Sequence, residues 1–226
     1  MGTLYLVPTP IGNLEDITLR ALRILRDVSL IAAEDTRTSH VLLNHYDIKT
    51  PLTSYHEHNK LTKLDAILGA LANGDVALIS DAGTPAISDP GYELVKTVIE
   101  VGYRVEALPG ANALLPALTA SGLPTDSFLF LGFFPRKQSQ QTALLTEIAS
   151  LRHTLIWYES PNRLIDTLAI IHDQLGDRPI CVAREISKKF EEFVRGDISA
   201  VITQFEQIAP RGEIVLMMGG AVDSPL

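Results

Sequence analysis

Hydrophobic and polar positions follow two different periods along the first half of this chain. Four short apolar runs predict β-strands, at residues 4–7, 28–33, 76–80 and 104–108. Three segments with apolar residues at helical spacing lie between or after them, at residues 18–26, 61–72 and 91–101. In the first of these, Leu19, Leu22 and Leu25 share one face. Alternation of strands and helices predicts a largely parallel sheet with helices on both faces.

The pattern becomes looser after Pro109-Gly110. Further strands are predicted at residues 128–132, 154–158, 179–183, 190–195 and 213–218. Helices are predicted at residues 112–121, 139–151, 162–175 and 198–207. The last two strands flank a single helix, which favours a mixed sheet. The sequence therefore predicts two α/β domains, at residues 1–112 and 113–226, with a hinge near residues 110–116.

Composition and charge narrow the class of protein. The chain has 226 residues, of which 46% are hydrophobic and 20% charged, and this composition argues against a disordered protein. A formal net charge of −8 is untypical of nucleic-acid binding, so any RNA contact must use local clusters of Lys and Arg. One cysteine, Cys181, permits no disulfide within the chain and no cysteine-only metal site. Because neither a signal peptide nor a membrane-length apolar run is visible, we expect a cytoplasmic protein.

The segment from Pro8 to Asp16 is the first candidate for chemistry. It follows the first predicted strand, at the edge where open α/β folds bind ligands. Two prolines stiffen it, and Gly12 lets it turn. It is neither a Gly-x-Gly-x-x-Gly fingerprint nor a phosphate-binding P-loop. The alternative interpretation is an ordinary connection to the first helix, with Asp16 near its N-cap.

The segment from Ser80 to Gly91 is the second candidate. Its sequence, Ser-Asp-Ala-Gly-Thr-Pro-Ala-Ile-Ser-Asp-Pro-Gly, is longer than the roughly 2–6 residues of a routine strand-to-helix loop. Its small residues allow a ligand to approach the backbone, and Asp81 supplies an acceptor for a hydroxyl or ammonium group. The alternative is a pair of successive Asx turns.

Two further strand ends carry charged groups. Glu34-Asp35-Thr36-Arg37 suits a polar active site, although Asp35 or Thr36 as a helix N-cap explains it almost as well. Aromatic rings and cations are adjacent in Phe133-Phe134-Pro135-Arg136-Lys137, which suits a contact with a nucleic-acid base and its phosphate. The alternative is a strand end followed by a solvated basic turn. At Tyr158-Glu159-Ser160 we favour helix capping by Ser160. His56 and His58, with no further His or Cys cluster, are weak evidence for a metal site, and no metal is expected.

Taken together, these motifs resemble those of the tetrapyrrole methylases. The resemblance rests on the segments beginning at Pro8, Glu34, Ser80 and Tyr158, and it extends over about residues 3–219. Within the family it is greatest with the branch that methylates the 2′-hydroxyl of a cytidine in small-subunit (16S) ribosomal RNA. The resemblance implies two α/β domains of the tetrapyrrole-methylase type, a cleft between them that binds S-adenosyl-L-methionine, and a homodimer.

The resemblance also implies positions that contact the cofactor. They are Pro10 in the first loop, Ser80, Asp81, Ala82, Gly83 and Thr84 in the second, Asn112 and Ala113 at the interdomain helix, and Glu159, Glu185 and Glu213 in the second domain. Tetrapyrrole-modifying members have a Gly-rich first loop and Gly-Asp-Pro in the second, whereas this chain has Pro-Ile-Gly and Ser-Asp-Ala. That difference weakens the alternative of a tetrapyrrole precursor as the methyl acceptor. A binding module without catalysis is the other alternative.

A ribose hydroxyl is a poor acid, so methyl transfer to it is helped by a positioned proton acceptor or a polarising cation. We expect Glu34 or Asp35 to accept the proton, and Arg37 or Lys137 to hold the adjoining phosphate. The expected partner is small-subunit rRNA within an assembled 30S particle. Three basic clusters are candidates for contacting it: Arg20 with Arg23 and Arg26, Arg136 with Lys137, and Lys188 with Lys189.

Overall fold

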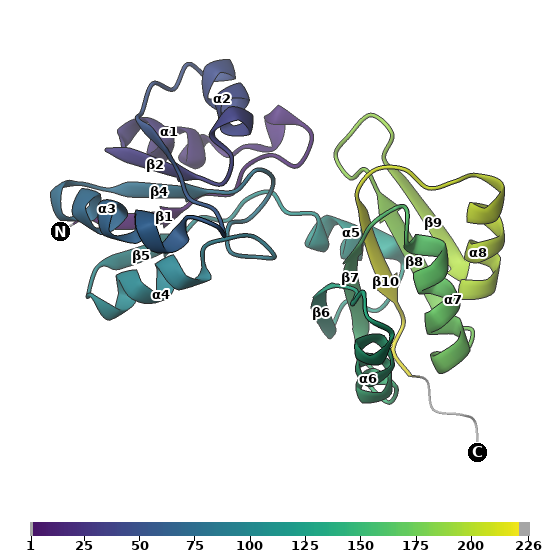
Figure 1. Ribbon diagram of the computed structural model, residues 1–226. Coiled ribbons are helices and arrows are strands. Elements are labelled where there is room, and N and C mark those ends of the chain that lie inside the picture. Colours follow the sequence, from purple (N-terminus) through teal and green to yellow (C-terminus); the bar gives the residue numbers. More distant parts are fainter. Residues whose placement is uncertain (1, 222–226) are drawn as a thin grey trace. The chain divides into compact units, whose positions relative to one another are not determined.

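The computed structural model describes residues 2–221 and divides the chain into two compact units, Met1–Asn112 and Ala113–Leu226. Figure 1 shows each unit as a sheet covered by helices on both faces. The expected fold class, two α/β domains, is confirmed.

Unit 1 is built on a five-stranded parallel sheet in the order β3-β2-β4-β1-β5. Its strands are β1 (Thr3–Leu6), β2 (Leu30–Ala33), β3 (Leu52–Ser54), β4 (Val76–Ile79) and β5 (Arg104–Ala107). Its helices are the 3-10 turn η1 (Leu14–Asp16), α1 (Leu19–Asp27), α2 (Thr36–His45), α3 (Lys60–Asn73) and α4 (Tyr92–Glu100). The side chains of β4 are buried throughout, as expected for a central strand covered on both sides.

Two apolar clusters show which helices cover each face of this sheet. Leu22 and Leu25 of α1 and Leu43 of α2 pack with Ile31 and Ile79 on one face. On the other face, α3 and α4 pack against the sheet through Ile67, Leu71, Leu94 and Val98, among others. Unit 1 is therefore a three-layer, doubly wound fold whose ligand edge lies at the carboxyl ends of the strands.

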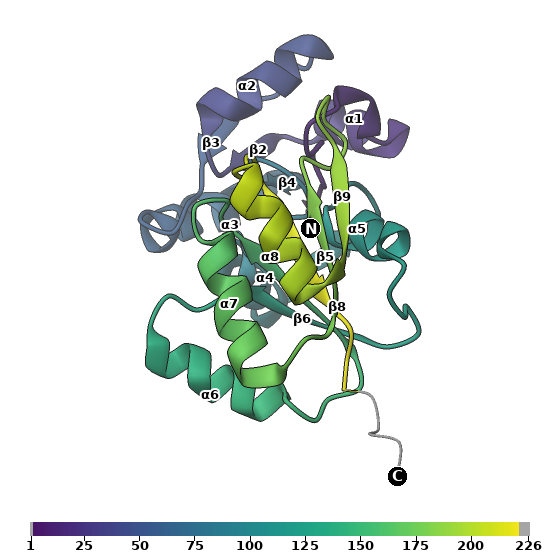
Figure 2. The same ribbon diagram turned by 90° about the vertical axis from the view of Figure 1, so that its right-hand side faces the viewer.

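Unit 2 contains a mixed five-stranded sheet in the order β6-β7-β10-β8-β9, in which only the β6–β7 pair is parallel. Its strands are β6 (Phe128–Phe133), β7 (Thr154–Glu159), β8 (Pro179–Arg184), β9 (Glu192–Asp197) and β10 (Ile214–Met218). Its helices are α5 (Leu114–Ser121), α6 (Gln138–Ile148), α7 (Leu164–Leu175) and α8 (Ile198–Gln207). One cluster around Trp157 joins α6, α7 and α8 to one face of the sheet, while α5 packs against β8 and β10 (Figures 1 and 2).

Most predicted elements lie within two residues of the observed ones, and three differences have clear causes. The strand predicted from residue 28 begins at Leu30, because the Val28 N–H still bonds to the Ile24 carbonyl as the C-cap of α1. The sequence pattern did not predict α2, which buries only Ser39, Leu42 and Leu43. Nor did it predict β3, which is only three residues long.

Candidate active site

The strand order places a topological switch point between β1 and β4 in unit 1. From β1 the chain crosses over α1 to β2 on one side, and from β4 it crosses over α4 to β5 on the other. The two strands are paired in parallel, with Leu6 opposite Leu78, so the loops that follow them diverge from neighbouring points. A crevice forms where connections diverge in this way, and it is the usual ligand site of open α/β sheets.

These two loops are joined by a short antiparallel bridge. The Thr9 N–H donates to the Gly83 carbonyl at 2.9 Å, and the Gly83 N–H donates to the Thr9 carbonyl at 2.9 Å. The buried Thr9 hydroxyl also donates to the Ser80 carbonyl at 3.0 Å, and the Ser80 hydroxyl to the Gly83 carbonyl at 3.3 Å. The loops that contain Pro10 and Ser80–Thr84 therefore form one rigid structure.

The loop after β5 joins the same structure. The Thr84 hydroxyl donates to the Ala111 carbonyl at 3.2 Å. A Cβ on Gly110 would lie 2.7 Å from Pro8 Cβ, so this glycine permits close contact between the first and third loops. Asn112 follows directly and donates to the Gly110 carbonyl at 3.4 Å. The structure thus brings the predicted cofactor positions of unit 1 together, while Ala113 begins unit 2 as the residue before α5.

The backbone of the segment from Ser80 to Gly91 adopts unusual conformations. Ala86 and Ser88 have φ of 68° and 61°, in the left-handed region that residues other than glycine rarely adopt. Gly91, with φ of 151°, is tightly packed, since a Cβ there would lie 3.0 Å from both Leu78 Cδ2 and Ala86 Cβ. Strained backbone of this kind persists where the surrounding structure enforces it, which is frequent at ligand sites.

Carboxylates from β2 and β4 meet at this edge. The Asp35 N–H donates to Asp81 Oδ1 at 3.0 Å, and the Asp81 N–H donates to Glu34 Oε2 at 3.5 Å. Asp35 is also the N-cap of α2, because its Oδ1 accepts from the Arg37 N–H at 2.8 Å. The capping interpretation of Asp35 is therefore confirmed. Arg37 in turn binds Asp35 Oδ2 through Nη2 at 2.6 Å.

The protonation preferences of these carboxyls differ. The hydrogen bond from Arg37 holds the pKa of Asp35 at about 2, so Asp35 is a weak base. Burial raises the pKa of Glu34, and the negative charge of Asp81 raises it further. Partial burial also raises the pKa of Asp81. Of the two proton acceptors predicted from sequence, Glu34 has the more suitable environment.

Asp89 belongs to the same group of carboxyls, and the sequence motifs assigned it no role. Burial raises its pKa to about 6, with a further contribution from the charge of Glu34, while a hydrogen bond from Ser80 opposes the rise. A signal was present in the sequence, since Asp81 and Asp89 lie in one unusually long loop. The sequence did not show that both aspartates lie near Glu34, because the backbone between them contains the left-handed residues Ala86 and Ser88.

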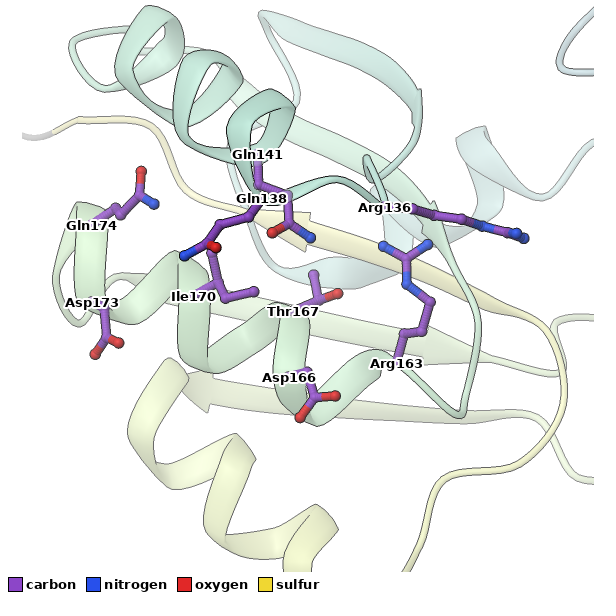
Figure 3. Close-up of a pocket in the computed structure, with 9 residues that line it drawn as sticks. All are labelled: Arg136, Gln138, Gln141, Arg163, Asp166, Thr167, Ile170, Asp173 and Gln174. Carbon is purple, nitrogen blue, oxygen red and sulfur yellow. The ribbon is translucent and has the colours of Figure 1, made fainter.

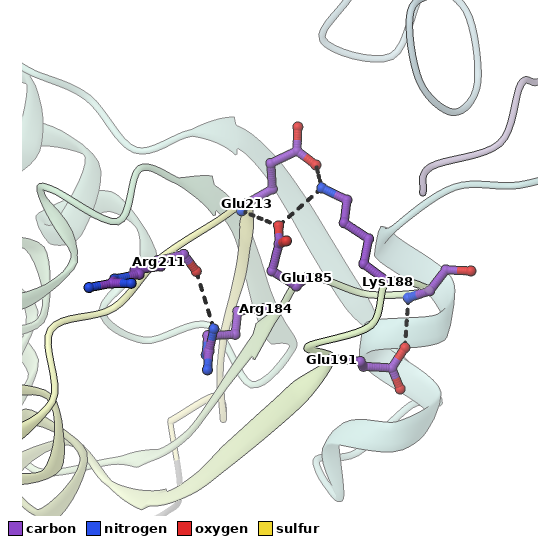
Figure 4. A network of polar contacts seen from close by, with 7 residues as sticks. Arg184, Glu185, Lys188, Glu191, Arg211 and Glu213 are labelled. Carbon is purple, nitrogen blue, oxygen red and sulfur yellow. Dashed lines mark hydrogen bonds and ion pairs between the residues drawn. The ribbon is translucent and has the colours of Figure 1, made fainter. Parts of the chain in front are cut away.

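In unit 2, Glu185 and Glu213 are held together by Lys188 (Figure 4). Lys188 Nζ lies 3.0 Å from Glu185 Oε1 and 2.7 Å from Glu213 Oε2, and the Glu213 N–H donates to Glu185 Oε1 at 3.0 Å. Gly212, with φ of 82°, lies beneath the Glu185 carboxyl, where a Cβ would come within 2.3 Å of it. That Glu185 and Glu213 contact the cofactor stays a prediction.

Glu159 lies inside unit 2, with a side chain that is 0% exposed. Its carboxylate accepts from the Ser160 N–H at 2.7 Å and from the Thr167 hydroxyl at 2.6 Å. Its Oε2 is also 3.5 Å from Arg163 Nη2. The favoured interpretation of Ser160 as a helix cap is wrong, because α7 begins at Leu164 with Arg163 at the N-cap and no side-chain capping bond. The contact of Glu159 with the cofactor stays a prediction, and its carboxylate already has two hydrogen-bond donors and a cation within the unit.

The three basic clusters differ in whether their Arg and Lys side chains already have partners within the protein. Arg20 pairs with Glu106, Arg23 lies 3.9 Å from Asp27, and Arg26 donates to the Tyr46 carbonyl. In the second cluster, by contrast, the side chains of Arg136 and Lys137 are exposed and make no hydrogen bond or ion pair within residues 2–221.

In the third cluster, Lys188 is bound to two glutamates, and Lys189 lies over the ring of Phe190, 5.6 Å from its centroid. Arg136 and Lys137 therefore form the basic cluster that is most available to an anion. Lys137 belongs to unit 2, whereas the other predicted catalytic residues, Glu34, Asp35 and Arg37, belong to unit 1.

The described residues also bear on two other kinds of site. No group of three or more His, Cys, Asp or Glu side chains within residues 2–221 is arranged to hold a metal ion. Over the same part of the chain, no helix has both the length and the apolar character needed to cross a membrane.

Residues 3–202 match the family model of the tetrapyrrole (corrin/porphyrin) methylases. The chain is 52% identical to ribosomal RNA small subunit methyltransferase I from Halalkalibacterium halodurans, in an alignment that covers 97% of this chain and 76% of that protein. It is 47% identical to the protein of the same name from Thermotoga maritima, where the coverage is 97% and 99%. A crystal structure of diphthine synthase matches 96% of this chain and 90% of that one, with a TM-score of 0.76 and 11% identity, so it supports the fold alone.

Proposed function

The chain belongs to the tetrapyrrole methylase family, and on this premise we propose that it transfers a methyl group from S-adenosyl-L-methionine to the 2′-hydroxyl of a cytidine in small-subunit ribosomal RNA. The observation that supports this most is the 52% identity, over 97% of the chain, to a relative named as an rRNA small subunit methyltransferase. The alignment with this relative spans 220 residues, and identity at this level is far above that of the solved structures that share only the fold.

The chemistry of the crevice suits this cofactor. S-adenosylmethionine carries two cationic groups, the sulfonium and the α-ammonium, and both are stabilised by nearby carboxylates. Glu34, Asp81 and Asp89 form such a group, and the raised pKa of each shows that its ionised form is poorly stabilised by the protein alone. Gly83 and Gly110 allow the three loops of the crevice to pack closely against one another, because a Cβ at these positions would approach Ile11 and Pro8 respectively.

The cofactor supplies an activated methyl group, so the protein has to orient the acceptor and manage one proton. Glu34 is the proposed proton acceptor for the ribose hydroxyl. Asp89 is a second candidate in the same cluster, because a pKa of about 6 is close to working pH. Asp35 positions Arg37 instead of accepting the proton, since their ion pair holds its pKa low. Arg37, whose side chain is 89% exposed, would hold the phosphate beside the target.

The partner side of the proposal depends on Arg136 and Lys137. They are the basic cluster that the protein does not neutralise, and exposed Phe133 lies beside them in sequence. With a net charge of −8, the chain is poorly suited to naked RNA, which favours an assembled 30S particle in the cytoplasm as substrate. A homodimer is part of the same proposal.

The experiment that tests the function is transfer of a tritiated methyl group from S-adenosylmethionine. Unmethylated 30S particles should be labelled, and digestion to nucleosides should recover the label in 2′-O-methylcytidine. A porphyrinogen should not be labelled under the same conditions, which would exclude the alternative of a tetrapyrrole precursor. If the protein binds the cofactor but labels neither acceptor, the proposal fails and a binding module remains.

A further inference from the structure

A pocket lies between α6 and α7 in unit 2, and its lining includes Arg136, one of the two cations proposed to contact the RNA (Figure 3). Its volume is about 440 Å³, within the roughly 300–1,000 Å³ typical of ligand sites. Its lining comes from the start of α6 and from one face of α7: Arg136, Gln138, Gln141, Arg163, Asp166, Thr167, Ile170, Asp173 and Gln174. This face of α7 is polar except for Ile170 where it passes α6, whereas packed helices usually bury apolar residues.

The floor of the pocket is fixed by hydrogen bonds. Gln141 is 7% exposed, and its Nε2 donates to the Pro135 carbonyl at 2.9 Å. That bond orients the amide so that Oε1 is the free atom, and no other described residue donates to it. The side chain points across the pocket toward Thr167, whose hydroxyl is held by Glu159. The floor therefore presents a preorganised hydrogen-bond acceptor.

The rim adds groups that likewise lack partners. The side chains of Gln138 and Asp166 are exposed and make no hydrogen bond or ion pair within residues 2–221. Arg136 and Arg163 lie at one end of the pocket, where the Arg136 side chain extends outward from the other labelled residues, and Asp173 and Gln174 lie at the opposite end (Figure 3). Positive charge thus lies at one end, while acceptors line the middle and the other end.

This distribution restricts the ligand. A simple anion is disfavoured because Asp166 and Asp173 would repel it. A suitable ligand has an anionic group for Arg136, a flat body that packs on Ile170, and N–H donors for Gln141 Oε1 and Asp166. An unpaired nucleotide with an exocyclic amino group meets all three requirements, since carboxylates and amides accept from such groups on base edges.

We propose that the pocket between α6 and α7 binds an unpaired, amino-bearing nucleotide of the RNA substrate, with its phosphate on Arg136 and its base over Gln138, Gln141 and Ile170. This inference rests on the proposed function for the identity of the substrate, but its first test does not require turnover. Cytosine, adenine and guanine carry an exocyclic amine with two N–H donors, one for each acceptor, whereas uracil has a single ring N–H, so the pocket selects against uracil.

The test measures binding of fluorescein-labelled ten-nucleotide RNAs by anisotropy at low salt. The wild type should bind oligocytidine and oligoadenosine about tenfold more tightly than oligouridine. Gln138→Ala combined with Asp166→Ala should lower the first two affinities to the oligouridine level and leave oligouridine unchanged. This variant also removes the negative charge of Asp166. If net charge alone governed binding, its affinity for every RNA would increase, whereas the proposed contacts predict a decrease for oligocytidine and oligoadenosine.

The matched control is Gln140→Ala with Glu147→Ala, the same kinds of exposed side chain on α6 but outside the pocket lining. It should keep the wild-type preference. Equal affinity of the wild type for the three RNAs, no binding of any of them, or a preference that survives in the pocket variant would overturn the inference. With 30S particles, the pocket variant should raise KM about tenfold and change kcat less than twofold. A wild type that methylates no 30S particle would refute the proposed function instead, and the oligonucleotide result would still stand.

Discussion

Thr9 and Gly83 exchange two backbone hydrogen bonds, each of 2.9 Å, and so connect the loop after β1 to the loop after β4. The exchange requires Gly83 to adopt a φ of 87°, and a Cβ there would lie 3.4 Å from Ile11 Cγ2. Both loops carry positions proposed to contact the cofactor. The geometry of the crevice therefore depends on one backbone conformation that glycine alone adopts without strain.

Gly83→Ala should accordingly destabilise unit 1 by about 1–2 kcal/mol, the cost of a left-handed conformation for an L-residue, and should weaken cofactor binding. Urea denaturation and calorimetry with S-adenosylmethionine measure the two effects. The control is Gly69→Ala in α3, where a Cβ meets nothing within 4 Å. That change should instead stabilise the helix by about 0.5–1 kcal/mol. Equal stability of the two variants would contradict the role given to the Thr9–Gly83 bridge.

Asp81 provides the second prediction. Its carboxylate already accepts from the Asp35 N–H at 3.0 Å and lies in the cluster proposed to face the cofactor cations. Asp81→Ala should weaken binding of S-adenosylmethionine about tenfold or more, because removal of a charged hydrogen bond costs roughly 1.5–3 kcal/mol. Asp65→Ala, an exposed change on α3, removes the same charge and should leave the affinity unchanged. Wild-type affinity in the Asp81 variant, measured by calorimetry, would count against this site.

The pKa of Asp89 predicts a dependence on pH. A carboxyl whose pKa is raised to about 6 from 3.8 binds its proton more tightly in the folded state. It therefore makes the folded state progressively less stable as pH rises from about 4 to about 6. Asp89→Asn should increase the free energy of unfolding at pH 7 by about 1 kcal/mol, a figure reduced because the group is partly exposed. At pH 4 the gain should vanish.

The same titration should affect the cofactor. Ionised Asp89 attracts the cationic groups of S-adenosylmethionine, so wild-type affinity should rise as pH increases through the pKa of about 6, and the rise should be smaller in Asp89→Asn. Urea melts and calorimetry over this range measure both effects. A variant that is no more stable than the wild type at pH 7 would show that the carboxyl is already well stabilised.

The proposed homodimer is tested by light scattering at micromolar concentration. The chain has a mass of 24.7 kDa, so the expected mass is about twice this value. A monomer mass would refute the prediction.

The sequence was informative where local patterns decide structure and less so where distant segments meet. The buried strand Val76–Ile79 and the helix with Leu22 and Leu25 on one face were both predicted, because burial gives each a clear period. The helix Thr36–His45 was not predicted from apolar spacing, because it buries few apolar residues, and only the N-cap interpretation of Asp35 indicated where it begins.

For the site, the sequence showed which loops carry chemistry but not how their side chains pair. Asp35 and Glu34 are equal candidates for the base in the sequence, and the ion pair with Arg37 distinguishes them. From the sequence, Glu159 is a charged residue at the end of a strand. In the structure its carboxylate is buried in unit 2 and accepts a hydrogen bond from the Thr167 hydroxyl. Such pairings depend on side-chain direction, which a single sequence does not show.

Arg136 and Lys137 give the last prediction. Of the three basic clusters, theirs lacks neutralising partners within the described chain, whereas Arg20 is bound to Glu106 and Lys188 to two glutamates. If this cluster holds phosphate, Arg136→Ala with Lys137→Ala should reduce methyl transfer to 30S particles strongly. It should also reduce the slope of log affinity against log salt by about 0.7 for each phosphate of a single strand that the variant no longer neutralises. Binding of S-adenosylmethionine, which carries no phosphate, should stay within about twofold of the wild type.

The matched control for this pair is Arg20→Ala with Arg23→Ala, which also removes two positive charges but from side chains that already face Glu106 and Asp27. Its salt slope should match that of the wild type, because neutralised cations release few phosphate counterions. Comparing the two double variants separates a specific phosphate contact from a general effect of net charge. Full methyl transfer by the Arg136 and Lys137 variant, or equal salt slopes in the two variants, would mean that the RNA is held elsewhere.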